Sequence, residues 1–194
     1  MQIILASQSL QRKKVLESMG LDFKVEPADI DELAVKISDP KKRAKVLARM
    51  KGEVIEKKYS DKKDVIIISA DTYGVLDGVV LEKPRTLEEA EEMLAAQSGK
   101  TAISYTGFYY SHLSKGIIFN EVSETIRKFR NFSKAEIKKY VNNNPVLTWS
   151  AAFCAAYVEG AALIESMEGA LVGLTHGLPT QFLIPCLKKS GVIK

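Results

Sequence analysis

Hydroxyl and basic side chains closely follow the first apolar run of the sequence. Residues 3–6 are apolar, Ser7 comes next, and Arg12 and Lys13 follow a few positions later. A strand that leads into a helix N-terminus presents free backbone N–H groups, and hydroxyls and cations beside them can bind a phosphate group. A capped helix start with surface lysines explains the same pattern. The segment alone therefore permits both interpretations.

A carboxylate and a hydroxyl follow the most apolar strand candidate. Residues 65–70 are β-branched or small, and Asp71 and Thr72 come directly after them. In open α/β sheets ligands collect at the carboxyl ends of strands. A carboxylate at such a position can bind a divalent metal or polarise a water molecule. The alternative is that Asp71 caps a turn.

Two further segments hold charged groups. Lys83 precedes Pro84, which restricts the backbone locally, and the loop 29–32 ends at Glu32. The acidic residues of this loop are further possible metal ligands. Taken alone, the acidic segment is better explained as a solvated loop.

Alternating strand and helix patterns must position these groups, and they predict an α/β fold of mixed α+β character with a mixed sheet. Ser9 and Gly20 bound the first helix, and Asp77-Gly78 predicts a hairpin turn. The predicted strands cover 3–6, 21–25, 65–70, 75–81 (as the hairpin), 101–110 and 116–129, and the predicted helices cover about 10–19 and 41–59 and begin near 86, 133 and 180.

Length and composition exclude several classes of protein. The chain has 194 residues, of which 46% are hydrophobic and 27% charged, close to globular averages. We therefore expect residues 1–194 to form one domain, and a disordered chain, a fibrous repeat and a disulfide scaffold are excluded. Cys154 and Cys186 have apolar neighbours and are predicted to be buried thiols of a reducing compartment. The absence of a signal-like N-terminus and of a long apolar run predicts a cytoplasmic protein with no membrane partner.

The positive charge is unevenly distributed. Between residues 36 and 63 eleven Lys and Arg oppose four acids, which gives this stretch +7 while the whole chain carries +4. Such a stretch could attract a polyanion, or it could be a solvated helix face. No aromatic residues are interleaved in the pattern of a nucleic-acid-binding module, so a nucleic-acid partner is the less favoured prediction.

The order and spacing of these segments resemble the Maf family, nucleoside triphosphate pyrophosphatases first described as septum-formation inhibitors. The resemblance covers nearly the whole chain and is most specific in the first half. The family motifs Ala-Ser-x-Ser-Pro-Arg-Arg, Leu-Ala-x-x-Lys-Ala, Ala-Asp-Thr, Leu-Gly-Lys-Pro, Ser-Gly-Arg-Thr, Tyr-Thr-Gly and Gly-Leu-Pro correspond to residues 6–12, 47–52, 70–72, 81–84, 98–101, 105–107 and 177–179.

The resemblance implies an elongated two-lobed fold with a central mixed sheet and a cleft between the lobes. It also implies metal-dependent hydrolysis of a nucleoside triphosphate to a monophosphate and pyrophosphate, with Mg, or alternatively Mn or Co, as cofactor and with a homodimer as assembly. Asp71, Glu32 and Lys83 would be catalytic, and Glu32 and Asp71 would hold the metal. The phosphates would be bound by Ser7, Arg12, Lys51 and Lys83, with lesser contributions from Lys13 and Thr72.

Departures from the family pattern keep other functions open. Leu10-Gln11 replaces the family's Pro-Arg, Glu82 replaces a glycine, and residues 150–157 replace a glycine-rich stretch. Lys13 could compensate for the arginine that Gln11 replaces. One alternative is a nucleotide-binding regulator of cell division with weak or no catalysis. An inosine-triphosphate-type pyrophosphatase would change the base and keep the reaction.

The remaining candidates have ordinary interpretations. His112 is predicted to lie at the surface in a hairpin turn, and His176 to lie near the cleft. Two histidines so far apart in sequence make a zinc site improbable. Trp149 and Phe153 could stack on a base, but core packing is the favoured prediction.

Overall fold

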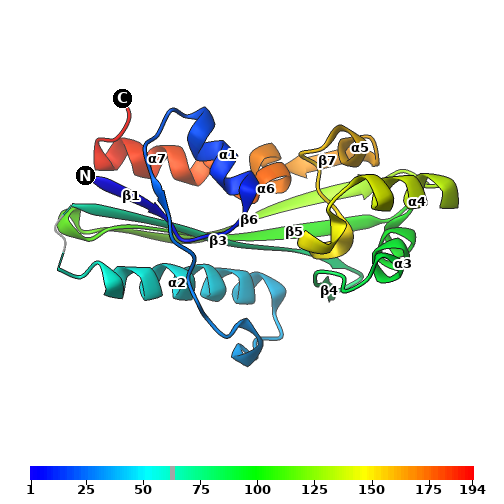
Figure 1. Cartoon of the computed structure of the whole chain (residues 1–194), viewed down its shortest axis with the longest axis horizontal. Helices are drawn as coiled ribbons and strands as arrows, with labels where there is room; N and C mark the ends of the chain where they lie inside the picture. The colour runs from blue at the N-terminus through cyan, green and yellow to red at the C-terminus, as the bar shows by residue number, and fades with distance from the viewer. Residues whose placement is uncertain (62–63) are drawn as a thin grey trace.

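A mixed sheet runs along the long axis of the molecule (Figure 1). The computed structural model describes residues 1–61 and 64–194, apart from the side chain of Leu33. Within that part, seven strands form the sheet in the order β2-β1-β3-β5-β6-β7, with β4 also paired to β3. The strands are β1 (Gln2–Leu5), β2 (Lys24–Val25), β3 (Val65–Leu76), β4 (Val79–Leu81), β5 (Thr101–His112), β6 (Ile117–Phe129) and β7 (Ile164–Gly169).

Helices cover both faces of this sheet. In Figure 1, α2 lies below it, while α1, α6 and α7 lie above it and α3 and α4 pack at the far end. The predicted elongated α/β fold with a central mixed sheet is thereby confirmed. The helices are α1 (Leu10–Ser18), α2 (Pro40–Lys58), α3 (Leu87–Gln97), α4 (Lys134–Asn143), α5 (Val158–Ala161), α6 (Leu171–His176) and α7 (Thr180–Ser190), and Glu32–Ala34 form a 3₁₀-helix, η1.

Most helix boundaries follow the sequence signals. Ser9, Thr86 and Ser133 cap α1, α3 and α4, and Ser133 forms a complete capping box with Glu136. The Asp77-Gly78 hairpin between β3 and β4 is also confirmed. The predicted strand 21–25 is reduced to Lys24–Val25, because only these two residues pair with β1.

The central strand β3 is longer than its apolar run predicts. It does not end before Asp71 but continues to Leu76, with Asp71 opposite Gly107 and Thr72 opposite Thr106 on β5. The prediction that Asp71 follows the strand was therefore wrong. Polar residues are tolerated within this strand because their side chains find partners in other elements, as described below.

One edge of β3 is interrupted, and this interruption creates the site. The strand β1 pairs with residues 65–68 of β3, and β4 pairs with residues 74–76. Among the residues that the structure describes, no strand pairs with residues 69–73 on this edge. The segments that follow β1 and precede or follow β4 therefore leave the edge of β3 beside its middle residues.

The hydrophobic core forms separate clusters along the sheet. One cluster lies among β1, β3, β5, α1 and α7, and a second lies among α3, α4 and the far ends of β3, β5 and β6. Two smaller clusters pack α2 against the sheet. Phe153 belongs to the second cluster, and Trp149, partly buried, packs against it and lies 4.9 Å from the ring of Tyr157, so both have the predicted packing role.

The packing of α2 on the sheet depends on a glycine of β5. A Cβ atom on Gly107 would overlap the carbonyl group of Ala44 and lie 3.0 Å from the backbone nitrogen of Lys45. The helix backbone therefore approaches the strand as closely as it does because no side chain stands between them.

Three polar residues of the core are informative. Both cysteines are buried and free, as predicted. His112 is fully buried, with Nε2 3.0 Å from Oδ1 of Asp64, so the prediction of a surface histidine was wrong. The reason is that β5 continues through His112, which pairs with Ile66 and Ile117 before the turn begins.

Arg127 is a charged residue of the core that no sequence signal indicated. Its guanidinium is fully buried between the rings of Phe129 and Phe153, and burial lowers its pKa to about 10. Its partners among the described residues are neutral, namely the hydroxyl of Ser104 and, at 3.5 Å, the amide oxygen of Gln97. No described helix is both long and apolar enough to cross a membrane.

Candidate active site

Three of the predicted residues meet in one cluster beside the open edge of β3. Nζ of Lys51 lies 2.6 Å from Oδ1 of Asp71 and 2.9 Å from Oε1 of Glu32. The side chains of Lys51 and Asp71 are 13% and 9% exposed, whereas that of Glu32 is 46% exposed. One ammonium group thus pairs with two carboxylates from different elements, which leaves the three side chains with one net negative charge.

The helix α2 faces the sheet with a regular apolar stripe, and this stripe positions Lys51. Leu47 and Ala48 are buried, and Lys51 follows them by one helical turn on the same side. Ser69 strengthens the contact, because its hydroxyl donates a hydrogen bond to the carbonyl of Ala48 at 2.6 Å. Helix and strand are therefore fixed to each other one turn before the Lys51–Asp71 contact.

Arg12 forms a second group with three separate acceptors. Its Nη1 donates to Oγ of Ser7 at 2.9 Å, its Nη2 to Oγ1 of Thr72 at 3.1 Å, and its Nε to the carbonyl of Gly177 at 2.8 Å. Burial lowers the pKa of Arg12, and the nearby charges of Asp71 and Glu32 oppose that shift. The guanidinium thereby connects the loop after β1, the middle of β3 and the loop after α6.

The two groups approach the open edge from opposite faces of the sheet. Asp71 and Thr72 are neighbours in a strand, so their side chains point to opposite faces. Asp71 meets α2 on one face and Thr72 meets Arg12 on the other. The interruption of the strand edge therefore exposes a carboxylate pair and two cations along one short stretch of backbone.

Other predicted residues are not part of these groups. Lys13 forms an exposed ion pair with Glu17 at 3.4 Å, on the outer side of α1. Lys83 is exposed and, within the described part of the chain, forms no ion pair or hydrogen bond. Gln11 is buried, and its side-chain oxygen has no partner among the described residues. His176 is partly buried and bonded to Thr175, next to the Gly177 carbonyl that holds Arg12.

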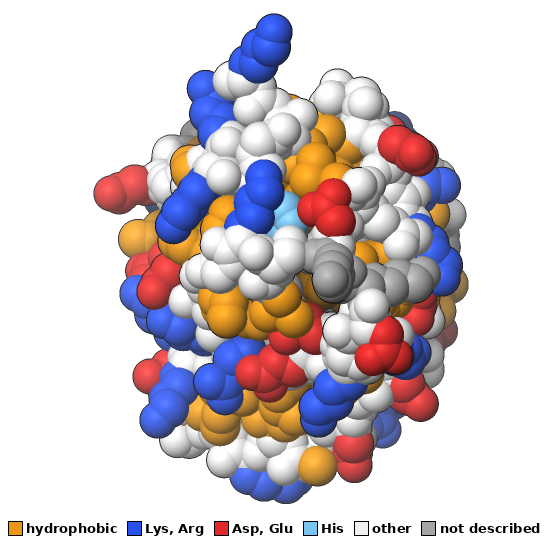
Figure 2. Space-filling model, turned by 90° about the vertical axis from the view of Figure 1, so that its left-hand side faces the viewer, with side chains coloured by type: hydrophobic (Ala, Val, Ile, Leu, Met, Phe, Trp, Pro, Cys, Tyr) orange, Lys and Arg blue, Asp and Glu red, His pale blue; other side chains and the backbone are white. Residues whose placement is uncertain are grey.

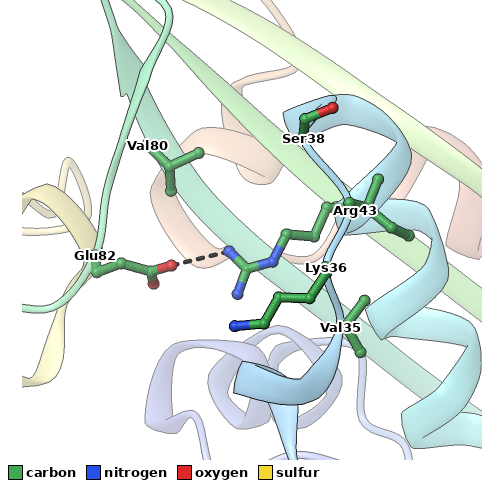
Figure 3. A pocket seen from close by; sticks show the side chains of 7 residues that line it. Val35, Lys36, Ser38, Arg43, Val80 and Glu82 are labelled. Carbon is green, nitrogen blue, oxygen red and sulfur yellow. Dashed lines mark hydrogen bonds and ion pairs between the residues drawn. The ribbon is translucent and has the colours of Figure 1, made fainter.

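A pocket of about 480 Å³ adjoins the cluster, and Arg43 and Glu82 face each other across it (Figure 3). Nη1 of Arg43 lies 2.9 Å from Oε1 of Glu82, and Nη2 lies 3.5 Å from the carbonyl oxygen of Glu32. Burial is the largest single influence on the pKa of Arg43 and lowers it, but the bond to Glu82 and the negative charges of Glu82 and Asp71 together raise it. The wall residues are Val35, Lys36, Ile37, Ser38, Arg43, Val80 and Glu82.

Arg43 is a residue of the site that sequence reasoning missed. The sequence interpretation placed it in a basic stretch without a specific role. Its spacing did hold a signal, because Arg43 and Lys51 are eight residues apart in one helix and so lie on the same side. The other missed contributor is the carbonyl of Gly177, which no side-chain pattern could reveal.

The basic stretch is largely neutralised by acids from other elements. Lys41 pairs with Glu124 and Lys45 with Glu121, both from β6. Lys62 and Lys63 lie outside the described residues. Figure 2 shows basic and acidic side chains interspersed over the end of the molecule that it presents. The absence of a nucleic-acid partner stays a prediction.

The donor set at the cluster fits a hard divalent cation that other ligands help to hold. Among the residues that the structure describes, no group of three or more Cys, His, Asp or Glu gathers in one place. Mg²⁺ is commonly bound through one or two carboxylates, with waters and substrate phosphates completing its octahedron. The facing oxygens of Glu32 and Asp71 supply that number of carboxylates.

Comparisons with known proteins give a consistent picture. A model of the Maf-like protein family matches residues 2–190. A dTTP/UTP pyrophosphatase of Thermotoga maritima is 35% identical over 187 residues, which cover 94% of this chain and 88% of that protein. A dTTP/UTP pyrophosphatase of Pyrococcus abyssi is 35% identical over 96% of this chain and 95% of its own length. A nucleoside triphosphate pyrophosphatase of Synechococcus sp. is 32% identical, with 86% and 83% covered.

Proposed function

Because the chain belongs to the Maf-like protein family, we propose that it is a nucleoside triphosphate pyrophosphatase, a hydrolase that releases a nucleoside monophosphate and pyrophosphate. The observation that carries this proposal is the cluster of Lys51, Asp71 and Glu32 beside the Arg12 group at the open edge of β3. Residues 1–194 would act as one such domain.

Cations of the site would bind the triphosphate. A triphosphate carries about four negative charges, and phosphoryl transfer depends mainly on neutralising this charge and on positioning the reactants. Arg12, Lys51 and Lys83 are the proposed cations, and Ser7 and Thr72 are proposed to orient Arg12. Lys83 is free to close on the substrate because its ammonium group has no partner within the described chain.

Glu32 and Asp71 would hold a divalent metal, with Mg proposed and Mn or Co as alternatives. When bound, the metal would neutralise phosphate charge and polarise the anhydride. Asp71 is also proposed to orient the attacking water molecule and to accept its proton, as the water oxygen bonds to the α phosphorus and pyrophosphate leaves with the bridging oxygen. The low exposure of Asp71 suits that role, because the surrounding fold holds the carboxylate in one position.

Substrate and setting are further parts of the proposal. The Thermotoga and Pyrococcus relatives are named as dTTP/UTP pyrophosphatases, so dTTP and UTP are the proposed substrates. The proposed location is the cytoplasm, where two buried free thiols remain reduced. The homodimer implied by the family resemblance can be tested by light scattering.

The test is pyrophosphate release from a panel of common and modified nucleoside triphosphates with Mg²⁺, Mn²⁺ or Co²⁺. We expect release from dTTP and UTP, and we expect Asp71→Asn to lower turnover at least about a hundredfold. Asp77→Asn is the matched control, because Asp77 lies in the β3–β4 turn, where it pairs with Lys100. Wild-type-like turnover by Asp71→Asn would remove Asp71 from the mechanism. Nucleotide binding without product from any triphosphate would instead support a regulator.

A further inference from the structure

We infer that Lys51 occupies the metal position until metal and triphosphate arrive together, an inference that rests on the function proposed above. The same two oxygens that would hold a divalent cation, Oδ1 of Asp71 and Oε1 of Glu32, both contact Nζ of Lys51, at 2.6 and 2.9 Å. The ammonium group thus lies where a bridging cation would have to lie. Metal binding and the observed Lys51 contacts exclude each other.

The surroundings make this exclusion strong. Lys51 and Asp71 are almost completely buried, so water screens little of the repulsion between an ammonium group and a divalent cation. A Mg²⁺ ion binds oxygen at about 2.0–2.1 Å and cannot share these oxygens with a nitrogen that stands between them. The ammonium group must therefore withdraw before both carboxylates can bind the metal.

Lys51 is the residue suited to such an exchange. Three of the five N–H donors of Arg12 bond to Ser7, Thr72 and Gly177, so its guanidinium is held in place from three sides. A lysine has a flexible four-carbon stem and three rotatable donors, so it can leave two carboxylates and contact phosphate oxygens nearby. Once the two carboxylates bind the metal, the phosphates of the incoming triphosphate would take their place as the negative partners of Lys51.

The consequence is positive coupling between the two ligands. Without a triphosphate, a metal must displace Lys51 and leave its ammonium group without an anion, so metal binding should be weak. With a triphosphate, Lys51 gains a new partner and the metal gains phosphate ligands. Because coupling is reciprocal, the metal must strengthen triphosphate binding by the same factor.

The test measures Mn²⁺ binding in the absence of any nucleotide, by titration of the free-ion electron paramagnetic resonance signal. We expect Lys51→Met to bind Mn²⁺ at least tenfold more tightly than the wild type, because the competing ammonium group is gone. Lys45→Met is the matched control, since Lys45 lies on the same helix and pairs with Glu121 away from the cluster. It should leave Mn²⁺ affinity unchanged. Unchanged or weaker binding by folded Lys51→Met would overturn the inference.

A second measurement on the wild type decides the matter if Lys51→Met does not fold. Adding the non-hydrolysable α,β-methylene analogue of UTP should raise Mn²⁺ affinity at least tenfold, and equal Mn²⁺ affinity with and without a bound analogue would overturn the inference. Pyrophosphate release by the wild type is recorded separately. Release without the predicted metal behaviour would contradict only the exchange, whereas no release from any triphosphate would contradict the proposed function.

Discussion

Replacing Gly107 by Ala tests how closely α2 must approach the sheet. The added Cβ would overlap the carbonyl group of Ala44 and lie 3.0 Å from the nitrogen of Lys45, both in the helix backbone. Backbone cannot rotate away as a side chain can, so α2 must retract by roughly 1 Å to restore ordinary contact distances. Overpacking of this kind costs about 1–3 kcal/mol, and we expect about 3 kcal/mol because the obstacle is a helix.

The loss should be visible as a lower melting temperature. For a chain of 194 residues, each kcal/mol of destabilisation lowers Tm by about 2–4 °C, so Gly107→Ala should melt about 6–12 °C below the wild type. Urea unfolding should show a lower midpoint with an unchanged slope. Because Gly107 lies directly opposite Asp71 in the β3–β5 ladder, retraction of α2 should also lengthen the Lys51–Asp71 contact. We therefore expect a fall in kcat/KM of about tenfold or more.

Gly173→Ala supplies the matched control for this substitution. Gly173 lies within α6, and the nearest atoms to a Cβ there are side-chain atoms, Oγ of Ser123 at 3.2 Å, Cβ of Ala170 at 3.5 Å and Cβ of Ser123 at 3.8 Å. Since alanine favours the helical state over glycine, this variant should melt at or slightly above the wild-type temperature. A Gly107→Ala protein that melts within 2 °C of the wild type, a shift that corresponds to about 0.5–1 kcal/mol, would refute the argument.

Three other predictions concern stability and reactivity. Arg127→Met should be more stable than Arg127→Lys, because methionine removes a buried charge that has only neutral partners; the opposite order of melting temperatures would show that the charge is needed. The hydrogen bonds from Arg130 and from the helix cap lower the pKa of Glu136 from 4.5 to about 2. The contribution of Glu136 to the free energy of unfolding is therefore complete above pH 4.5 and is lost as the pH falls toward 2. In urea unfolding, Glu136→Gln should lose less stability than the wild type between these two pH values. Burial raises the pKa of Cys154, and that of Cys186 to about 11, so both should react with a thiol reagent far more slowly in the native than in the unfolded protein.

The sequence was most informative where local chemistry decides the structure. The caps at Ser9 and Ser133 and the turn at Asp77-Gly78 are short-range signals, and each lies where it was predicted. The apolar run of β3 was also recognised, but its end was not. Asp71 and Thr72 continue the strand because Lys51 and Arg12 provide partners from elsewhere in the chain, and no local pattern describes such partners.

The site was predictable to a similar extent. The resemblance selected Glu32, Lys51 and Asp71, and the fold brings both carboxylates within hydrogen-bond distance of the Lys51 ammonium group. It could not show that Arg12 would be held by a backbone carbonyl 165 residues away, nor that Arg43 and Glu82 would face each other across a pocket. These contacts depend on the paths of loops, which are determined by packing and not by residue type.

The long strands have a mechanical consequence for substrate capture. Three of them, β3, β5 and β6, contain 12, 12 and 13 residues and pass through both core clusters. At about 3.3 Å per residue, these three strands form a continuous part of the sheet about 40 Å long, and none of them is interrupted by a loop. The two ends of the sheet therefore cannot close on a nucleotide by a hinge motion. If the site acts as proposed, capture depends instead on the short segments that border the open edge and hold Glu32 and Lys83, while the long strand β3 keeps Asp71 in place.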